Sequence, residues 1–473
     1  FGTARREAGW INITSLPMVM ATKPLVGLVG PRGLLVFPLL GSVLACLAAG
    51  ELGRRFGATS WRPGFWVAAS CSPISVYALD FWEHSLGLGL MMAGVASLLY
   101  VLDASSPPLG WAAGSGLAFG LAATMRTEAL VYGFVAGLVC LLGGSRTSPG
   151  MRVVRSGCMA VAALVPLIVN QLAEAAVYGS ALRSDRAAGA LQTTGSIGVV
   201  QRLQEGILIT ASPINLVHPL SMAMAALVAV GVVWLAWALL SETDPSRPAA
   251  LCGLVVLLVF LRLVTFGPTF IPGMLAAVPA AGLGIAALIK RRDVTLGVLL
   301  LAPIPLVWAT QYPGAAEAQW AGRYILTSGL VLAVFGAVVV ARSNPRLVAG
   351  FLAANLFMTV LGVTYLVNRT NDFGSANRTV AGMDGVVVFT ESFLAREGAP
   401  LGWEREWLSA RDEGQRQVVV RILDQRGLDG FTLIANEQEG LPEFEGFEPR
   451  SWGRELSYGQ LTMIETAYVR HSG

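Results

Sequence analysis

Long apolar runs are the feature that most restricts what this chain can fold into. They recur from residue 33 to residue 366, and most approach the roughly 20 residues that a helix needs to cross a bilayer. Hydrocarbon offers the backbone no hydrogen-bond partners, so helices are the default for such segments. Charged residues make up only 13% of the chain, well below the roughly 25% of soluble domains. The sequence therefore predicts an all-α polytopic membrane protein.

The apolar runs divide into about twelve predicted spans. Residues 1–32 are expected to belong to a first outer loop, residues 33–366 to form the transmembrane domain, and residues 367–473 to lie outside the membrane. A formal net charge of +3 on 473 residues gives no indication of a nucleic-acid partner. The predicted spans are 33–50, 63–79, 84–102, 110–125, 128–144, 156–172, 216–240, 249–265, 273–289, 294–310, 323–341 and 347–366.

The distribution of basic residues predicts the orientation of these spans. Cytoplasmic loops of membrane proteins carry an excess of lysine and arginine. One alternating set of short loops holds most of these residues, including Arg54, Arg55 and Arg62 after the first span. That set is therefore predicted to be cytoplasmic. Residues 1–32, the long loop 173–214 and the tail 367–473 are then predicted to be outside, in a multi-pass protein of the cell membrane.

The composition of the tail changes sharply after residue 366. Residues 386–389 form a strand-like apolar run, and residues 411–426 carry apolar positions at helical spacing. Residues 431–435 and 461–469 are typical of further strands. We therefore predict a small, soluble α/β domain of roughly 90 residues. It contains no recognisable catalytic constellation.

The first polar cluster is Asp80-Phe81-Trp82-Glu83-His84, between two apolar runs. Ionisable residues at the ends of membrane spans are costly and often functional. Helix capping and interfacial anchoring by Trp82 would explain one acid, but not two acids and a histidine. Asp80, Glu83 and His84 are therefore candidate catalytic residues, with capping as the alternative.

The second cluster contains Arg126 and Glu128, again between two apolar stretches. Residues two apart do not share a helix face, so we expect the two side chains to reach different partners. The planar guanidinium of Arg126 is suited to a phosphate oxyanion, and Glu128 is a candidate for binding the sugar or acceptor. Capping of the two adjoining helix ends is an equally open alternative.

The third cluster combines Gln319, Trp320, Arg323 and Tyr324 just before a span. Arg323 is a candidate phosphate ligand, and Gln319, Trp320 and Tyr324 are candidates for contacting a sugar or acceptor. An aromatic belt at the membrane surface would explain the rings, but not Gln319 and Arg323. A fourth polar region is the loop 173–214, which includes an amphipathic stretch at 199–209. Its charged residues are Glu174, Arg183, Asp185, Arg186, Arg202 and Glu205. A simple solvated loop remains open there.

Four stretches together resemble the C-superfamily of membrane glycosyltransferases, in the branch of bacterial relatives of dolichyl-phosphate-mannose protein mannosyltransferases and aminoarabinose lipid A transferases. The resemblance covers residues 1 to about 366. The stretches are FGTARREAGW with the following Lys23-Pro24-Leu25, then DFWEHSLGLGL, AATMRTEALVYG and QWAGRYIL. Each motif alone is weak, and their order and shared predicted side carry the resemblance.

The resemblance implies a hexosyltransferase-like enzyme of the cell envelope. Its donor would be a polyprenyl-phosphate sugar, and its acceptor a glycan, lipid or protein at the outer leaflet. Arg126 and Arg323 would hold the donor phosphate, with or without a divalent cation. The family's catalytic acidic motif lies in the first outer loop, and here would fall shortly before Phe1. We therefore expect the main base, and one further span, upstream of this chain, with Glu83 as a reserve base.

Two other classes of function fit the same composition. A transporter or flippase is expected to show internal repeats with broken spans at matching positions. Pro303 and Pro305 fall in one predicted span, without a clear counterpart elsewhere. A non-catalytic assembly protein of the cell envelope would use the tail to bind partners. The sequence leaves both alternatives open.

Overall fold

The protein is described from a computed structural model of the whole chain. The chain divides into two compact units, one formed by Ser15–Val363 and the other by Phe1–Thr14 with Thr364–Gly473. The described residues are 3–6, 9–12, 15–103, 109–143, 147–179, 272–310, 320–390, 407–437, 440–458 and 461–471, with single positions between 200 and 240.

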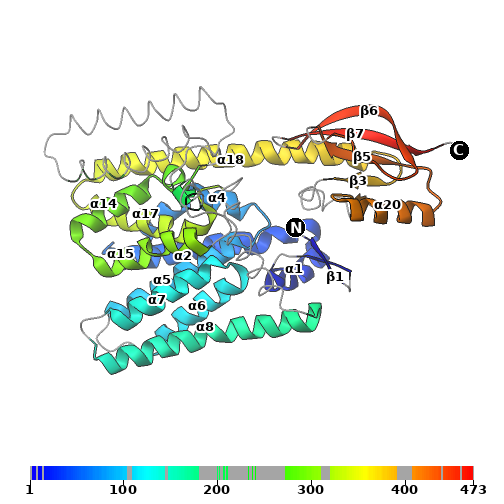
Figure 1. Cartoon of the computed structure of the whole chain (residues 1–473). Helices are drawn as coiled ribbons and strands as arrows, with labels where there is room; N and C mark the ends of the chain where they lie inside the picture. The colour runs from blue at the N-terminus through cyan, green and yellow to red at the C-terminus, as the bar shows by residue number, and fades with distance from the viewer. Residues whose placement is uncertain are drawn as a thin grey trace. The chain divides into compact units, whose positions relative to one another are not determined.

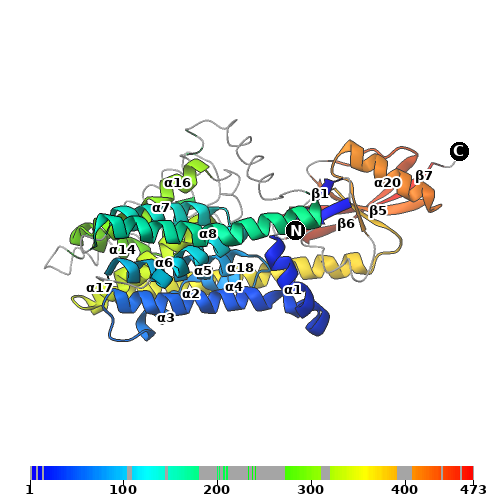
Figure 2. The same cartoon turned by 90° about the horizontal axis from the view of Figure 1, so that it is seen from below.

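The larger unit is built from helices (Figures 1 and 2). The first part of the chain supplies α1 (Leu16–Val29), η1 (Gly30–Leu35), α2 (Val36–Arg55), α3 (Arg62–Ala69), α4 (Ser72–Ala78), α5 (His84–Asp103), α6 (Leu109–Met125), α7 (Glu128–Leu142) and α8 (Pro149–Tyr178). The later part supplies α13 (Met274–Ala277), α14 (Ala280–Arg291), α15 (Val294–Leu301), α16 (Pro303–Thr310), η3 (Arg323–Ile325), α17 (Leu326–Ala341) and α18 (Pro345–Ala381).

Five of the described helical segments are long and apolar enough to cross a membrane, judged by length and composition. They are Arg32–Arg55, His84–Asp103, Pro149–Val177, Arg323–Ala341 and Pro345–Ala381. Residues Leu16–Val29, Leu109–Met125, Glu128–Leu142 and Val294–Thr310 are shorter apolar helical segments. Each of these nine segments except Leu16–Val29 overlaps a predicted span. The predicted spans 216–240 and 249–265 lie outside the continuously described residues.

Three predicted spans are not single helices, and prolines explain where they break. The span 63–79 is interrupted at Cys71, whose backbone is extended just before the Ser72-Pro73 start of α4. The span 273–289 breaks at Val278, ahead of Pro279, because proline disfavours a helical residue before it. The span 294–310 divides between Ala302 and Pro303, since proline lacks the N–H that continues a helix.

The loop boundaries also differ from the prediction. Residues 173–178, assigned to a long loop, continue helix α8. Within residues 1–32, also assigned to a loop, Leu16–Val29 forms α1. The final predicted span ends at residue 366, whereas α18 continues to Ala381 without a break.

Helix α17 is the central helix of the larger unit. It packs against α14, α2, α3 and α5. In its most apolar 18-residue stretch 89% of the residues are buried, compared with 22% in that of α8. Small residues permit this close packing. A Cβ on Gly336 of α17 would lie 2.5 Å from the backbone nitrogen of Gly284 in α14. Helices α5, α7 and α17 form a frame whose amino-terminal ends carry or adjoin the first three polar clusters.

The smaller unit contains a five-stranded mixed sheet with the strand order β4-β3-β5-β7-β6. Strand β3 runs parallel to both β4 and β5, and the β5–β7 and β7–β6 pairs are antiparallel. The residues are β3 (Val387–Phe389), β4 (Trp407–Ser409), α20 (Glu413–Gln425), β5 (Gly430–Asn436), β6 (Phe447–Tyr458) and β7 (Leu461–Arg470). A separate hairpin pairs β1 (Thr3–Arg6) with β2 (Gly9–Asn12).

Each face of the five-stranded sheet is covered by one helix. The end of α18 packs Phe373 and Val380 against one face, and α20 packs Val419 and Leu423 against the other. Alternate residues of a strand point to opposite faces, which places Val387 in one core and Val388 in the other. The predicted strands at 386–389, 431–435 and 461–469 and the predicted helix at 411–426 are confirmed to within a few residues.

Candidate functional site

Three of the polar clusters found in the sequence meet in the larger unit. One precedes α5, one separates α6 from α7, and one precedes α17. Ion pairs and cation–ring contacts join them, although their positions in the chain are far apart. We call this group the polar cluster, and define it as Trp82, Glu83, His84, Arg126, Glu128, Trp320, Arg323 and Tyr324.

Arg126 holds two carboxylates at the centre of the polar cluster. Its Nε donates a hydrogen bond to Glu128 Oε1 at 2.9 Å, and its Nη1 lies 3.7 Å from Glu83 Oε1. All three side chains are at most 7% exposed. Buried charges are tolerated only when they are paired, so these three residues form one electrostatic unit with an excess of negative charge.

The contact between Arg126 and Glu128 corrects the prediction that they reach different partners. That expectation assumed a continuous helix, on which residues two apart diverge. The chain instead leaves the α6 helix after Met125 and begins α7 at Glu128. The break lets both side chains turn toward each other. The stem of Arg126 also lies against Gly87 of α5, where a Cβ would be 2.6 Å from Arg126 Cγ.

Arg323 lies between aromatic rings rather than between carboxylates. Its guanidinium carbon is 4.8 Å from the ring centroid of Trp82 and 4.6 Å from that of Tyr324. Its Nη2 donates a hydrogen bond to the Tyr324 hydroxyl at 2.6 Å. Among the residues that the structure describes, no carboxylate forms an ion pair with it. Arg323 thus retains a positive charge that the described residues do not neutralise.

Tyr324 connects the two arginines. The guanidinium carbon of Arg126 lies 5.1 Å from the Tyr324 ring centroid, and Arg323 contacts the same ring. Cations are attracted to the faces of aromatic rings. The ring therefore offsets part of the repulsion between the two guanidinium groups.

A strained turn fixes the backbone before Arg323. Ala321 and Gly322 both have a φ of +61°, a conformation that is uncommon for residues with a side chain. The Ala321 N–H donates to the Pro272 carbonyl at 2.7 Å, and the Tyr77 hydroxyl donates to the Trp320 carbonyl at 2.8 Å. Strained backbone held by such contacts is common at functional sites.

His84 packs between two rings. Its imidazole is stacked on Tyr77, with centroids 4.9 Å apart, and is tilted against Trp82 at 4.6 Å. It is only 2% exposed. This position suits a residue that orients Trp82 beneath Arg323. Asp80 is half-buried in the same turn, where its carbonyl accepts a hydrogen bond from the Trp82 N–H at 2.7 Å.

Unused hydrogen-bonding capacity remains in the polar cluster. Four buried atoms of its charged side chains have no hydrogen-bond partner among the described residues: Glu83 Oε2, Arg126 Nη2, Glu128 Oε2 and Arg323 Nε. Leaving a buried polar group unsatisfied costs about 1–3 kcal/mol, and more for a charged one. Such atoms are expected where a polar ligand or water completes the arrangement.

Sequence reasoning missed several residues that support the polar cluster. Tyr77 holds the Trp320 backbone, and Gly87 makes room for Arg126. One turn after Glu128, the Tyr132 hydroxyl lies 2.7 Å from Ser328 Oγ, which donates to the Leu300 carbonyl at 2.6 Å. The four-residue spacing from Glu128 to Tyr132 places both on one helix face, but no signal in the sequence pointed to Ser328.

Other predicted residues lie elsewhere. Gln319 falls outside the described residues, as do Arg183, Asp185, Arg186 and Glu205 of the loop 173–214. Glu174 is buried on α8, where it accepts a hydrogen bond from Asn170 Nδ2 at 2.9 Å. Arg202 donates to the Ala309 carbonyl at 3.3 Å.

The described part of the chain contains no obvious set of metal ligands. No three histidine, cysteine, aspartate or glutamate side chains gather there as they would around an ion. Arg126 also occupies the space between the two buried carboxylates. Comparison with protein-family models and with curated proteins finds no match to this sequence.

Proposed function

We propose that this chain is a membrane glycosyltransferase that moves a sugar from a polyprenyl-phosphate donor to a cell-envelope acceptor. The observation that carries the proposal is the arrangement around Arg323. A guanidinium stacked on Trp82 and Tyr324 keeps its positive charge beside two buried carboxylates. Phosphate, a sugar ring and a hydroxyl nucleophile are the partners that such a set of groups can bind.

Arg323 is the donor phosphate ligand in this proposal. Its planar fork suits the bidentate binding of phosphate oxygens, and its Nε is free of described hydrogen bonds. In this proposal a sugar stacks on the partly exposed rings of Trp82 and Tyr324, while the buried Trp320 supports the turn before Arg323. Arg126 takes a positioning role instead, because Glu83 and Glu128 already neutralise its charge.

The proposed reaction breaks the bond between the sugar's anomeric carbon and the phosphate oxygen. The acceptor oxygen forms the new bond on the opposite face, and the configuration inverts. A carboxylate takes the acceptor's proton, while polyprenyl phosphate leaves with the bonding electron pair, stabilised by Arg323. Glu83 serves as reserve base through its Oε2, which has no hydrogen-bond partner among the described residues.

The proposed topology is that of a multi-pass cell-membrane protein with the polar cluster at the non-cytoplasmic ends of its helices. The arginine-rich loops support this orientation, because they adjoin the opposite ends of the same helices. Helix α5 begins at His84 in the polar cluster and ends at Asp103, a length of about 30 Å at 1.5 Å per residue.

A transfer assay tests the proposal directly. The full-length protein, reconstituted in vesicles, is supplied with radiolabelled polyprenyl-phosphate sugars and a cell-envelope extract as acceptor. Label should pass from the donor to the extract, and Arg323→Ala and Glu83→Gln should each slow the transfer. Arg292→Gln, a change outside the polar cluster, should not.

The rivals predict other results in the same vesicles. A transporter or flippase would move labelled donor across the bilayer without cleaving the bond to phosphate. An assembly protein would do neither. Unchanged transfer in both Arg323→Ala and Glu83→Gln would remove the polar cluster from the mechanism.

A further inference from the structure

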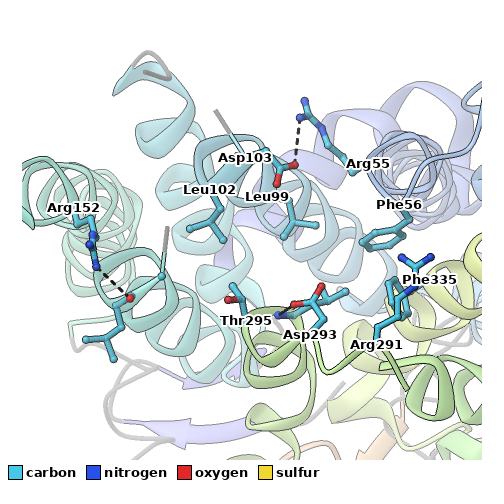
Figure 3. A pocket seen from close by; sticks show the side chains of 13 residues that line it. Arg55, Phe56, Leu99, Leu102, Asp103, Arg152, Arg291, Asp293, Thr295 and Phe335 are labelled. Carbon is cyan, nitrogen blue, oxygen red and sulfur yellow. Dashed lines mark hydrogen bonds and ion pairs between the residues drawn. The ribbon is translucent and has the colours of Figure 1, made fainter. Parts of the chain in front are cut away.

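A second polar site lies at the other end of the larger unit. A cavity of about 730 Å³ is lined by side chains from the ends of several helices, and Figure 3 shows it from close by. We call it the basic cavity. Its charged and aromatic lining includes Arg55, Asp103, Arg152, Arg291, Asp293 and Phe335.

The basic cavity and the polar cluster are separated by the length of the helices. Helix α5 runs from His84 in the polar cluster to Asp103 in the cavity, and α7 runs from Glu128 to Leu142 in the same direction. The two sites therefore share no residue. An inference about the cavity stands independently of the proposed transferase activity.

Both acidic residues of the basic cavity are already engaged. Asp103 lies 3.7 Å from Arg55 Nη1 in an ion pair. Asp293 Oδ1 accepts a hydrogen bond from the Leu296 N–H at 3.0 Å and so caps helix α15. Neither carboxylate pairs with Arg152 or Arg291. The positive charge of these two arginines is thus left for another partner.

The remaining arginines are held without carboxylates. Arg152 donates from Nε to the Thr147 carbonyl at 3.1 Å and from Nη1 to the Leu142 carbonyl at 3.4 Å. Arg291 lies over the Phe335 ring, 5.9 Å from its centroid. Within the described part of the chain, neither forms an ion pair. Backbone carbonyls and a ring orient these guanidinium groups but do not cancel their charge.

We propose that the basic cavity binds a phosphate-bearing ligand through Arg291, which lies beside Phe335, whereas Arg152 lies on the opposite side of the cavity (Figure 3). Arginine forks match phosphate oxygens, and the cavity volume is within the roughly 300–1,000 Å³ of small-ligand sites. Phe56, Leu99 and Phe335 provide an apolar wall for the organic part of the ligand. In the topology proposed above, this end lies at the cytoplasmic surface. Both anionic phospholipid headgroups and soluble phosphate esters are available there.

Binding measurements on the full chain in detergent micelles test this proposal. The probes are glycerol 3-phosphate and short-chain phosphatidylglycerol, with a short-chain diacylglycerol as the phosphate-free control. The wild-type protein should bind at least one phosphate probe more tightly than the control. Binding of phosphatidylglycerol alone identifies a lipid headgroup, whereas binding of glycerol 3-phosphate identifies a soluble ester, and either result supports the site.

The variant Arg291→Gln should bind the phosphate probe at least about tenfold more weakly, as expected for the loss of charge-assisted hydrogen bonds. The matched variant Arg292→Gln removes the same charge from a neighbouring arginine outside the cavity lining and should bind normally. Wild-type affinity in the Arg291 variant, or no preference for phosphate over the control, would overturn the proposal.

Discussion

Arginines lie at both ends of the frame formed by α5 and α7, but their partners differ between the two ends. In the polar cluster, Arg126 is buried and bonded to two carboxylates. In the basic cavity, Arg152 and Arg291 are oriented by carbonyls and a ring, and no described carboxylate pairs with them. The first arrangement neutralises the buried arginine, whereas the second leaves the two arginines without a described counter-charge.

Arg323 combines features of both ends. It lies within the polar cluster, next to buried carboxylates, but its own described contacts are aromatic rings and a tyrosine hydroxyl. Arg126, whose described partners are carboxylates, thus differs from Arg323, the proposed phosphate ligand. Separate measurements of folding stability and of phosphate binding test this distinction.

The largest expected effect on stability is that of Arg126→Gln. The substitution leaves Glu83 and Glu128 buried without their common partner, which is expected to cost about 3–5 kcal/mol. The free energy of unfolding in detergent micelles measures the loss. Arg54→Gln is the matched control, because it removes a surface ion pair with Glu51 worth about 0–1 kcal/mol. Equal losses in the two variants would show that Arg126 does not organise the polar cluster.

A smaller loss is expected for Gly87→Ala. The added methyl group would lie 2.6 Å from Arg126 Cγ, and relieving such overpacking costs about 1–3 kcal/mol. Gly114→Ala on α6 is the control, since nothing lies within 4 Å of a Cβ there. The same unfolding experiment should find Gly114→Ala as stable as the wild type. A neutral Gly87→Ala would mean that the stem of Arg126 can move away without consequence.

Arg291→Gln should change stability least, within about 0.5 kcal/mol, because exposed side chains without strong partners contribute little to folding. Its effect should appear in the binding of phosphate probes instead. Thermal unfolding without ligand measures the first quantity. A loss of stability comparable to that of Arg126→Gln would show that Arg291 stabilises the fold, as Arg126 is expected to do.

The sequence was most informative where a pattern is local. Apolar runs located most of the described helices of the larger unit, and short strand-like segments located β3, β5 and β7. It was wrong where local chemistry interrupts a pattern. Ser72-Pro73, Pro279 and Pro303 divide predicted spans into shorter helices, and a composition average over a span does not register a single missing N–H.

The candidate site was predictable in its members, but not in its contacts. Charged residues at span ends indicated Glu83, Arg126, Glu128 and Arg323. Spacing rules for a continuous helix excluded a bond between Arg126 and Glu128, and the helix break made that bond possible. The supporting contacts of Tyr77 with Trp320, and of Tyr132 with Ser328, join residues about 200 or more positions apart. Spacing along one sequence carries no information about such pairs.

The most direct test of the account is the binding of unlabelled polyprenyl phosphate, the proposed leaving group, to the full-length protein in micelles. Arg323→Gln should weaken binding at least about tenfold while the melting temperature stays near that of the wild type. Arg291→Gln, at the other end of the helices, should bind polyprenyl phosphate normally. Equal affinity in the wild type and in Arg323→Gln would contradict the assignment of Arg323 as the phosphate ligand.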